Sequence, residues 1–148
     1  MLRRRGRKLL LFTDGAIGAT GEAAGLGAVV RRPDGQILAW VTRRMGRMTN
    51  NEAEYAALVL GLQAALRFRP QELHCFLDSE IVMGQMRGDF SVHSPALRRW
   101  HTRACAAARR LPRVTYTHIP RERNRLADAL ANEALTGWDP GSQGGKGD

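Results

Sequence analysis

The stretch from Thr49 to Phe68 limits the possible folds more than any other part of the sequence. Thr49 or Asn50 can cap a helix there, and Pro70 follows its expected end. The apolar residues of this helix form two stripes, one of Ala53, Ala57, Leu60 and Ala64 and one of Leu58, Leu62 and Leu66. A helix that is apolar on two sides is buried between other elements. The rest of the chain must therefore supply packing partners on both sides of it.

Short apolar or alternating segments around this helix predict five strands. They cover residues 8–13, 25–31, 36–43, 73–77 and 113–119, and a turn at Pro33-Asp34-Gly35 makes a hairpin of the second and third. Three further helices are predicted at 79–86, 95–111 and 124–136. The predicted order is three strands, a helix, a strand, two helices, a strand and a helix. This order indicates an α/β fold, with helices packed against a mixed sheet.

The length of 148 residues, 43% of them hydrophobic, predicts one domain with one core. We expect a basic N-terminal extension over 1–7, the folded domain over 8–138 and a disordered tail over 139–148. No segment approaches the roughly 18 apolar residues of a membrane span, and the first apolar run is too short for a signal peptide. We therefore expect a cytoplasmic protein without membrane contact, and no feature predicts an obligate protein partner.

The two cysteines, Cys75 and Cys105, lie in apolar stretches and lack metal-ligand spacing. A secreted disulfide-rich protein would carry more cysteines, so we expect two buried free thiols in a reducing compartment.

The formal net charge is +9, and almost all of the 23 basic residues are arginine. Such an excess attracts polyanions, of which nucleic acid is the commonest in a cell. A genomic bias toward arginine codons would give the same excess without any binding role. The charge alone therefore leaves nucleic-acid binding undecided.

Four acidic residues lie at the ends of four different predicted elements. Asp14 and Asp78 follow apolar strands, Glu54 lies in the first turns of the buried helix, and Asp128 lies near the start of the last helix. Open α/β sheets place their ligand sites at such ends. If these carboxylates converge, raised pKa values or bound cations must relieve their repulsion. Magnesium is the natural cation, because it prefers oxygen ligands and keeps open positions for phosphate.

Each of these acids also has an ordinary structural explanation. Asp14 could be a turn residue, Asp78 a helix cap, Glu54 a residue favoured by the helix dipole, and Asp128 a solvated surface position. The residues around each acid favour the functional interpretation.

The segments around the four acids resemble the motifs of the type 1 ribonuclease H family, over about Lys8 to Trp138. They are Phe12-Thr13-Asp14-Gly15 followed by Gly25-Leu26-Gly27-Ala28, then Thr49-Asn50-Asn51-Glu52-Ala53-Glu54-Tyr55, Leu77-Asp78-Ser79, and Asn124-Arg125-Leu126-Ala127-Asp128-Ala129-Leu130-Ala131. The second motif places the catalytic glutamate at Glu54 and not at Glu52. Any one of these short motifs is weak, but four in the right order and spacing are strong.

The resemblance implies a ribonuclease H-like sheet of three antiparallel strands followed by two parallel ones, with helices on both faces. It implies an endonuclease that hydrolyses the RNA strand of RNA–DNA hybrids, leaving 5′-phosphate and 3′-hydroxyl ends, with duplex RNA as a second candidate substrate. Asp14, Glu54, Asp78 and Asp128 would be catalytic and would hold two magnesium ions at the scissile phosphate, with Asp14 bridging them. Manganese can substitute for magnesium.

The resemblance also implies substrate-binding residues at the start of the buried helix. Thr49 resembles a phosphate-binding position for the DNA strand, and Asn50 and Asn51 resemble residues that touch the minor groove, where a hybrid displays its 2′-hydroxyls. Helix capping by Thr49 or Asn50 is the simpler role, and the two roles are compatible. The basic protrusion of some bacterial members is absent, so we expect the substrate to be bound by Arg98, Arg99 and Arg103, or by Arg3, Arg4 and Arg5.

The chain departs from the family pattern at three places. Gly18-Ala19-Thr20-Gly21 replaces a Gly-Asn-Pro-Gly turn and lacks its substrate-contacting asparagine, and Glu80 stands where many members have glutamine. The loop that usually carries a histidine near the site is cut short to residues 119–123. His118 lies on the predicted strand before this loop, and we expect it to be structural rather than catalytic.

Two other functions compete with this interpretation. A non-catalytic nucleic-acid-binding relative would keep the basic surface but should lose a carboxylate, and none is lost. A resolvase on the same fold would also use clustered acids, but it would lack the Thr49-Asn50-Asn51 run and would cut DNA junctions.

Overall fold

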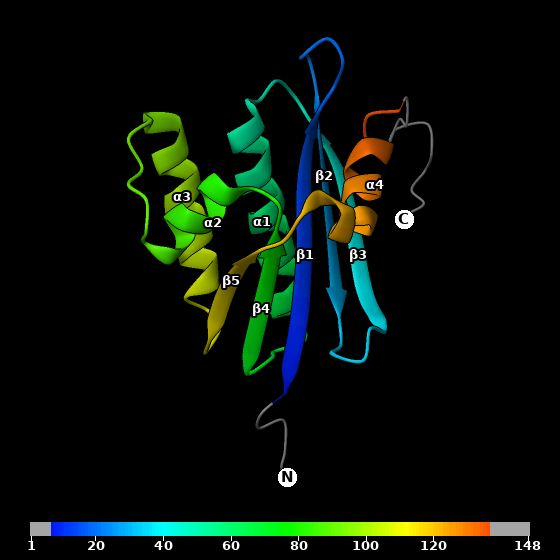
Figure 1. Ribbon diagram of the computed structural model, residues 1–148, viewed down its shortest axis with the longest axis vertical. Helices are drawn as coiled ribbons and strands as arrows, with labels where there is room; N and C mark the ends of the chain where they lie inside the picture. The colour runs from blue at the N-terminus through cyan, green and yellow to red at the C-terminus, as the bar shows by residue number, and fades with distance from the viewer. Residues whose placement is uncertain (1–6, 137–148) are drawn as a thin grey trace.

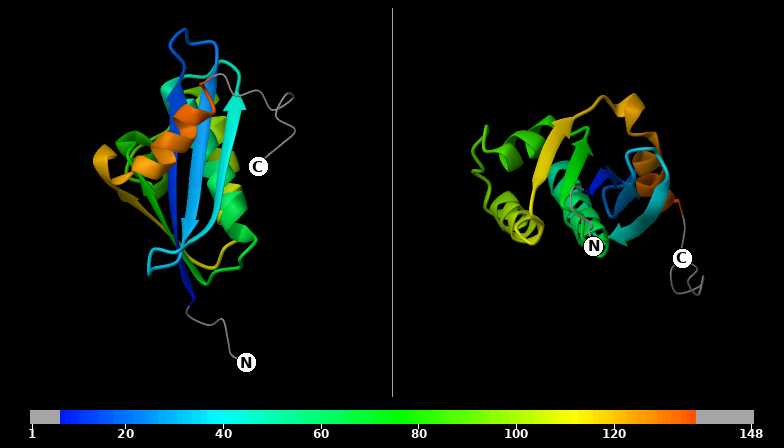
Figure 2. Two further views of the ribbon diagram at one scale, coloured as in Figure 1. Left: turned by 90° about the vertical axis from the view of Figure 1, so that its right-hand side faces the viewer. Right: turned by 90° about the horizontal axis from the view of Figure 1, so that it is seen from below.

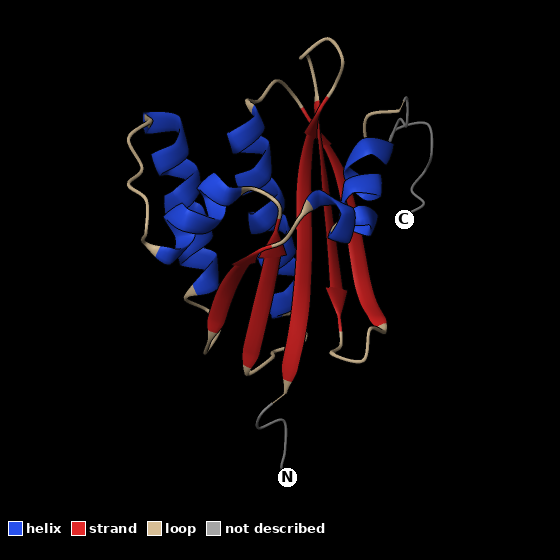
Figure 3. Cartoon of the chain, in the orientation of Figure 1, coloured by secondary structure: helices blue, strands red, loops and turns tan. Residues whose placement is uncertain are grey.

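The computed structural model describes residues 7–136, which form a five-stranded sheet with helices on both faces (Figures 1 and 3). The strands are β1 (Lys8–Ile17), β2 (Ala24–Arg31), β3 (Ile37–Met45), β4 (Glu72–Leu77) and β5 (Val114–His118). The helices are α1 (Asn50–Leu66), α2 (Glu80–Arg87), α3 (Pro95–Ala108) and α4 (Arg125–Glu133), with a single 3₁₀ turn, η1 (Arg121–Arg123), before α4. Apart from Arg7, the N-terminal extension with Arg3, Arg4 and Arg5 lies outside the described residues, as does the expected tail. Within residues 7–136, no helix is both long and apolar enough to cross a membrane.

The strand order β3-β2-β1-β4-β5 confirms the predicted sheet of three antiparallel and two parallel strands. β1 pairs antiparallel with β2, which pairs antiparallel with β3, while β4 lies parallel to both β1 and β5. The pairing of β1 with β2 continues to Ile17, but its pairing with β4 ends at Phe12. The last five residues of β1 therefore have a strand neighbour on one side only.

The helices cover the sheet unequally. Figure 2 shows α1 and α3 on one face of the sheet and α4 on the other. The α1 helix is buried on two sides, as its two apolar stripes predict. Leu58 and Leu62 belong to the main core with residues of β1, β4 and α3, whereas Ala53, Ala57 and Leu60 pack in a second cluster with residues of β2.

Three element ends differ from the sequence prediction by three residues or more. β1 runs on to Ile17 instead of ending at Thr13, because its ladder with β2 continues. α3 ends at Ala108 rather than at Leu111, because the Arg110 and Leu111 N–H groups donate to carbonyls three residues back and close a tighter turn. α4 ends at Glu133 and is followed by a turn over 134–136.

Both cysteines are free thiols, as expected, but only one of them is fully buried. Cys75 lies in the core, and Cys105 is half-buried on α3. The prediction of a buried thiol was wrong for Cys105, whose side chain stays partly accessible on α3.

Gly15 sets the distance between β1 and α1. A Cβ atom built at Gly15 would lie 2.5 Å from the carbonyl carbon of Ala53 and 2.8 Å from the backbone nitrogen of Glu54. Both contacts are with backbone, which cannot move aside as a flexible side chain can. The absence of a side chain at Gly15 thus lets the start of α1 approach the strand that carries Asp14.

We expect Gly15→Ala to destabilise the protein by about 1–3 kcal/mol, the usual cost of overpacking. The matched control is Gly46→Ala, because a Cβ at Gly46 would meet nothing within 4 Å and its backbone needs no glycine. The control should change the free energy of unfolding by less than about 0.5 kcal/mol. Urea unfolding of the three proteins measures both changes, and equal effects would contradict the role given to Gly15.

Candidate active site

Asp14 lies inside β1 and not at its end, which corrects the sequence prediction. It comes two residues after Phe12, where the pairing with β4 stops, and only 4% of its surface is exposed. Beyond that point, no strand within residues 7–136 separates the two faces of the sheet on the β4 side. Side chains from α1 and from α4 can therefore both reach Asp14, which a turn residue at the surface could not arrange.

Glu54 reaches the site from the second turn of α1. Thr49 caps this helix by accepting a hydrogen bond from the Glu52 N–H at 3.2 Å, and the Glu52 carboxylate accepts one from the Thr49 N–H at 3.0 Å. This capping box occupies Glu52 and leaves Glu54 as the acid of this motif that faces β1. The Glu54 Oε1 atom accepts a hydrogen bond from the Gly15 N–H at 3.2 Å.

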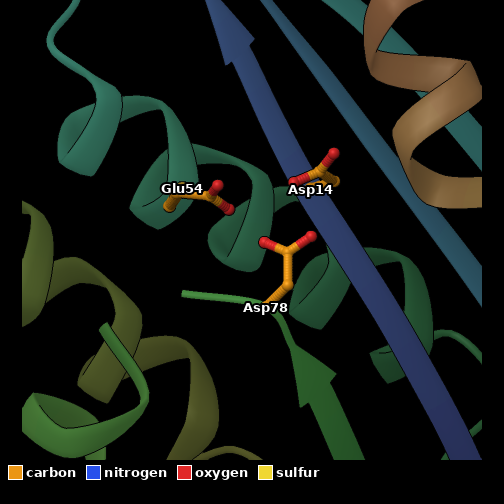
Figure 4. Close-up of side chains that lie close together, drawn as sticks. All are labelled: Asp14, Glu54 and Asp78. Atoms are coloured by element: carbon orange, nitrogen blue, oxygen red, sulfur yellow. The ribbon is translucent and has the colours of Figure 1, made fainter. Parts of the chain in front are cut away.

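Asp78 follows the last residue of β4 and precedes α2. The cap of α2 is Ser79, whose hydroxyl accepts a hydrogen bond from the Val82 N–H at 3.2 Å. Asp78 is therefore not the helix cap, and its carboxylate points toward β1. One carboxylate oxygen from each of Asp14, Glu54 and Asp78 lies within 4.8 Å of the other two (Figure 4).

Asp128 completes the acidic group from the opposite face of the sheet. It lies in the first turn of α4, and its Oδ1 atom accepts a hydrogen bond from Asn132 Nδ2 at 3.2 Å. Asp128 lines the same open cavity, of about 500 Å³, as the other three acids. Its carboxylate is half-buried, so it is not the solvated surface group that the alternative explanation required.

Burial and mutual repulsion change the titration of two of these acids. Burial raises the pKa of Asp14 to about 9, and the neighbouring charges of Glu54 and Asp78 add to the effect. Burial also raises the pKa of Glu54 to about 8, with a further contribution from Asp78 that the hydrogen bond from Gly15 partly offsets. Without a cation the folded protein therefore holds protons that free carboxyl groups would have lost.

The donor atoms of this site are suited to a divalent metal ion. They are carboxylate oxygens only, which hard cations such as magnesium prefer. Three of them lie close enough together to share one ion, and they open to a cavity rather than to the core. A bound cation would remove the repulsion that raises the pKa values of Asp14 and Glu54.

Asn124 holds the acidic elements together, a role that the sequence analysis did not assign. Its side chain is 2% exposed and donates hydrogen bonds to the Thr13 carbonyl at 2.9 Å and to Asp78 Oδ2 at 3.5 Å. Its backbone carbonyl accepts from the Asp128 N–H at 3.0 Å. Asn124 thus contacts Asp78 and Asp128 directly, and it contacts Thr13, the residue before Asp14. The fourth motif contains this asparagine, but the contact across 111 residues is not visible in the sequence.

The predicted substrate-binding residues occupy different positions relative to the acids. Asn50 lines the cavity, whereas Thr49, Asn51, Arg98 and Arg99 are not among its lining residues. Thr49 caps α1, as the simpler role required, and its binding role stays a prediction. Arg98 and Arg99 are exposed on α3, where Arg98 Nε donates to the Val92 carbonyl at 3.0 Å.

Glu80 and His118 differ in their position relative to the cavity. Glu80 is exposed in the first turn of α2 and does not line the cavity. His118 ends β5, and its exposed side chain lines the cavity instead of packing in the core. A purely structural role for His118 therefore gains no support from packing and stays a prediction.

Comparisons with known proteins agree with this geometry. The reverse transcriptase-like family model matches residues 12–134. The bifunctional protein Rv2228c of Mycobacterium tuberculosis is 38% identical over 129 residues, which are 86% of this chain and 35% of that protein. Ribonuclease HI of Halobacterium salinarum is 39% identical over 131 residues, covering 88% of this chain and 66% of its own. The chain thus spans about a third of the mycobacterial relative and about two thirds of the halobacterial one.

Solved structures share the whole fold. The N-terminal RNase H domain of the mycobacterial protein superposes with a TM-score of 0.83 at 38% identity, covering 87% of this chain and 94% of that one. LC11-RNase H1 in complex with an RNA/DNA hybrid superposes with a TM-score of 0.81 at 32% identity, covering 86% of this chain and 96% of that one. With its sheet order, its four motifs and most of its length matched, the chain belongs to the reverse transcriptase-like family of ribonuclease H domains.

Proposed function

We propose that this protein is a divalent-metal-dependent endonuclease that hydrolyses the RNA strand of RNA–DNA hybrids and leaves 5′-phosphate and 3′-hydroxyl ends. The observation that carries the proposal is the convergence of three carboxylates from three elements at a cavity that a fourth also lines. A relative named ribonuclease HI and a hybrid-bound structural neighbour support the substrate class. Because all four acids are retained, a non-catalytic role for the domain is disfavoured.

Asp14, Glu54, Asp78 and Asp128 are the residues that we propose hold the metal, which we take to be two magnesium ions with manganese as a substitute. When bound, such ions activate water for attack on phosphorus and stabilise the charge on the departing 3′ oxygen. The protein's own part is to hold the carboxylates in place before substrate arrives. The Gly15 N–H fixes one oxygen of Glu54, and the Asn124 amide positions the strand before Asp14 together with Asp78.

The proposed recognition of a hybrid depends on which elements begin near the acids. α1 and α3 both begin at the end toward which β1 runs (Figure 1). Asn50, in the first turn of α1, lines the cavity and can reach the minor groove, where a hybrid presents its 2′-hydroxyls. The backbone N–H groups at the start of α1, beside Thr49, offer donors to a phosphate of the DNA strand.

We expect the protein to cleave the RNA strand of a hybrid in magnesium or manganese and to leave duplex DNA and a four-way DNA junction intact. Only the hybrid and duplex RNA offer 2′-hydroxyls, and a duplex RNA substrate shows whether the DNA strand is also required. Gel analysis of end-labelled substrates measures cleavage and the product ends. Equal cleavage of duplex DNA and hybrid, or cleavage of the junction alone, would overturn the proposal.

The same assay tests the assignment of the acids. Glu54→Gln should reduce the rate by more than the roughly hundredfold that loss of an outer-shell metal partner costs. Glu52→Gln is the matched control two residues away, because glutamine can replace glutamate in a capping box. The control should retain activity.

Asp14→Asn should stabilise the metal-free protein, and the gain should grow as the pH rises. Asp14 has a raised pKa of about 9 when folded, against 3.8 as its ordinary value. The folded state therefore binds the Asp14 proton more tightly than the unfolded state does. The contribution of this group to stability is fully present below about pH 4 and is lost as the pH rises toward 9. Between pH 6 and pH 9 the variant should gain about 1 kcal/mol or more relative to the parent. Melting curves in EDTA measure this difference.

The control for this experiment is Asp89→Asn, which removes an exposed carboxylate outside the cavity. Its stability relative to the parent should not change in the same way with pH. Adding magnesium should raise the melting temperature of the parent and of Asp89→Asn more than that of Asp14→Asn, because a ligand stabilises the state that binds it. A pH-independent loss of stability in Asp14→Asn would instead identify an ordinary structural aspartate.

Replacing Arg98 and Arg99 together by alanine should flatten the dependence of hybrid affinity on salt. Each phosphate contact that is lost lowers the slope of log affinity against log salt by about 1. Arg109 and Arg110 directly follow the other end of the same helix and are also exposed, so their double alanine variant is the control. Fluorescence anisotropy in EDTA measures the slopes without cleavage. Identical slopes for both variants would assign Arg98 and Arg99 to the solvated surface.

A further inference from the structure

α4 covers only part of its face of the sheet. Figure 2 shows this helix crossing the half of the sheet toward which β1 runs. There the Thr42 hydroxyl donates a hydrogen bond to the Leu130 carbonyl at 2.7 Å, and Gly27 lies directly against the backbone of Ala127 and Ala131. Within residues 7–136, no helix covers the half of this face that is nearer the start of β1.

A row of three aromatic side chains and a valine lies beside the area that α4 covers. Its members, which pair with one another on four adjacent strands, are Trp40, Val29, Phe12 and Phe76. Trp40 is two residues before Thr42 on β3, so the row points to the α4 face. The rings of Phe12 and Phe76 stack with their centroids 4.9 Å apart, and Trp40 is 53% exposed. Partly exposed aromatic side chains on a sheet are suited to contact with unpaired bases.

A groove, which we call the α4 groove, opens between this row and the first turn of α4. Its cavity of about 440 Å³ lies within the roughly 300–1,000 Å³ of small-ligand sites. The floor of the groove is apolar and consists of Leu10, Phe12, Val29, Leu126 and Ala127. Leu10, Phe12 and Leu126 keep part of their surface exposed. A ligand with a flat apolar part would therefore remove apolar surface from water here.

The rim of the α4 groove is basic. Three arginines and one acid line it, namely Arg31, Arg123, Arg125 and Glu122. Arg31 donates to the Gly35 carbonyl at 3.0 Å and Arg125 to the Glu122 carbonyl at 3.1 Å, so both of these bonds are to uncharged groups. Within residues 7–136, none of the three arginines forms an ion pair. The groove therefore combines an apolar floor with positive charge that an anion can neutralise.

We propose that the α4 groove binds one nucleotide of a single-stranded segment that extends from the substrate. The base lies on the apolar floor beside Phe12, and the phosphates next to it contact Arg123 and Arg125 at the rim. A nucleotide carries a flat apolar group and a negative charge side by side, as this groove requires. A base inside a duplex cannot enter, because it is stacked on both faces and paired at its edge. The groove therefore selects unpaired nucleotides, of RNA or of DNA, with little preference for sequence.

This inference rests on the proposed function, which brings a nucleic acid to the acids. Phe12 and Asp14 lie two residues apart on β1 and point to the same face, a distance of about 7 Å along the strand. Only the η1 turn and the first turn of α4 separate the α4 groove from the cavity of the acids. A strand that leaves the acids on the α4 side can therefore place its next unpaired nucleotides in the groove.

The first test measures binding of single strands in EDTA by fluorescence anisotropy. The probes are a short oligothymidylate and an abasic strand of equal length, which keeps the phosphates but lacks the bases. The parent should bind the oligothymidylate about fivefold or more tightly than the abasic strand. Replacing Arg123 and Arg125 together by alanine should weaken oligothymidylate binding by about tenfold and lower its salt slope by about 1. The control with Arg109 and Arg110 replaced by alanine carries the same change in charge on the opposite face and should keep the base preference.

Tryptophan fluorescence locates the bound strand. Trp40 pairs with Val29 in the floor of the groove, so a base bound there should quench its emission. Quenching by the oligothymidylate should be strong in the parent and largely lost in Trp40→Phe, whereas the affinity measured by anisotropy should change by less than about threefold. Melting curves should show all variants folded, since Trp40 and the four replaced arginines are exposed.

The second test compares cleavage of a blunt hybrid with that of hybrids bearing a short single-stranded extension at either end. In the parent and in the control, an extension at one end should lower KM by about fivefold and leave kcat unchanged. The variant lacking Arg123 and Arg125 should cleave the blunt hybrid like the parent and gain nothing from the extension.

The outcomes separate the inference from the function on which it rests. If the parent cleaves no hybrid, the proposed function is wrong, and the binding test still decides whether the groove takes unpaired nucleotides. Equal binding of the abasic strand and the oligothymidylate would overturn the inference, since the site would then attract any polyanion. Equal behaviour of the two double variants, or quenching that persists in Trp40→Phe, would place the bound strand outside the α4 groove and overturn it as well.

Discussion

The repulsion between the buried Asp14 and its neighbours Glu54 and Asp78 is the constraint on which the rest of this structure depends. Like charges within 4.8 Å of one another oppose the approach of the elements that carry them. The fold must therefore bring β1, α1 and β4 together by contacts that involve no charge. The two-sided packing of α1 and the amide of Asn124 provide these contacts, and the lack of a side chain at Gly15 allows α1 to approach β1 closely. The proposed metal site would thereby form at a local cost in stability, as is common at functional sites.

The unequal lengths of neighbouring strands create the place where these charges can meet. β4 stops pairing with β1 at Phe12, while β2 continues beside β1 to Ile17. The sheet thus opens on one side of β1, and acids from helices on opposite faces reach the same strand residue. If β4 were longer, the sheet would separate Glu54 from Asp128. The short β4 is therefore as important for the site as the acids themselves.

Much of this arrangement could be predicted from the sequence, because it depends on local patterns. The two stripes of α1, the Thr49 cap and the choice of Glu54 over Glu52 follow from spacing within a few residues or from a motif. The position of Asp14 inside β1 could not be predicted, since it depends on where two neighbouring strands stop pairing. The contact of Asn124 with Thr13 spans 111 residues and leaves no local signal. Long-range hydrogen bonds of single side chains are the part of the site that only the structure reveals.

The distribution of charge gives the site its dependence on cations. The chain has a net charge of +9, so its surface as a whole attracts a polyanion, yet four of its 14 acidic residues line one cavity. A phosphate backbone drawn to the arginines would be repelled by these carboxylates at the point where we propose that it is cut. Metal ions bound among the carboxylates would resolve this conflict. Under the proposed function, the metal would be needed for productive placement of the phosphate as well as for the chemistry.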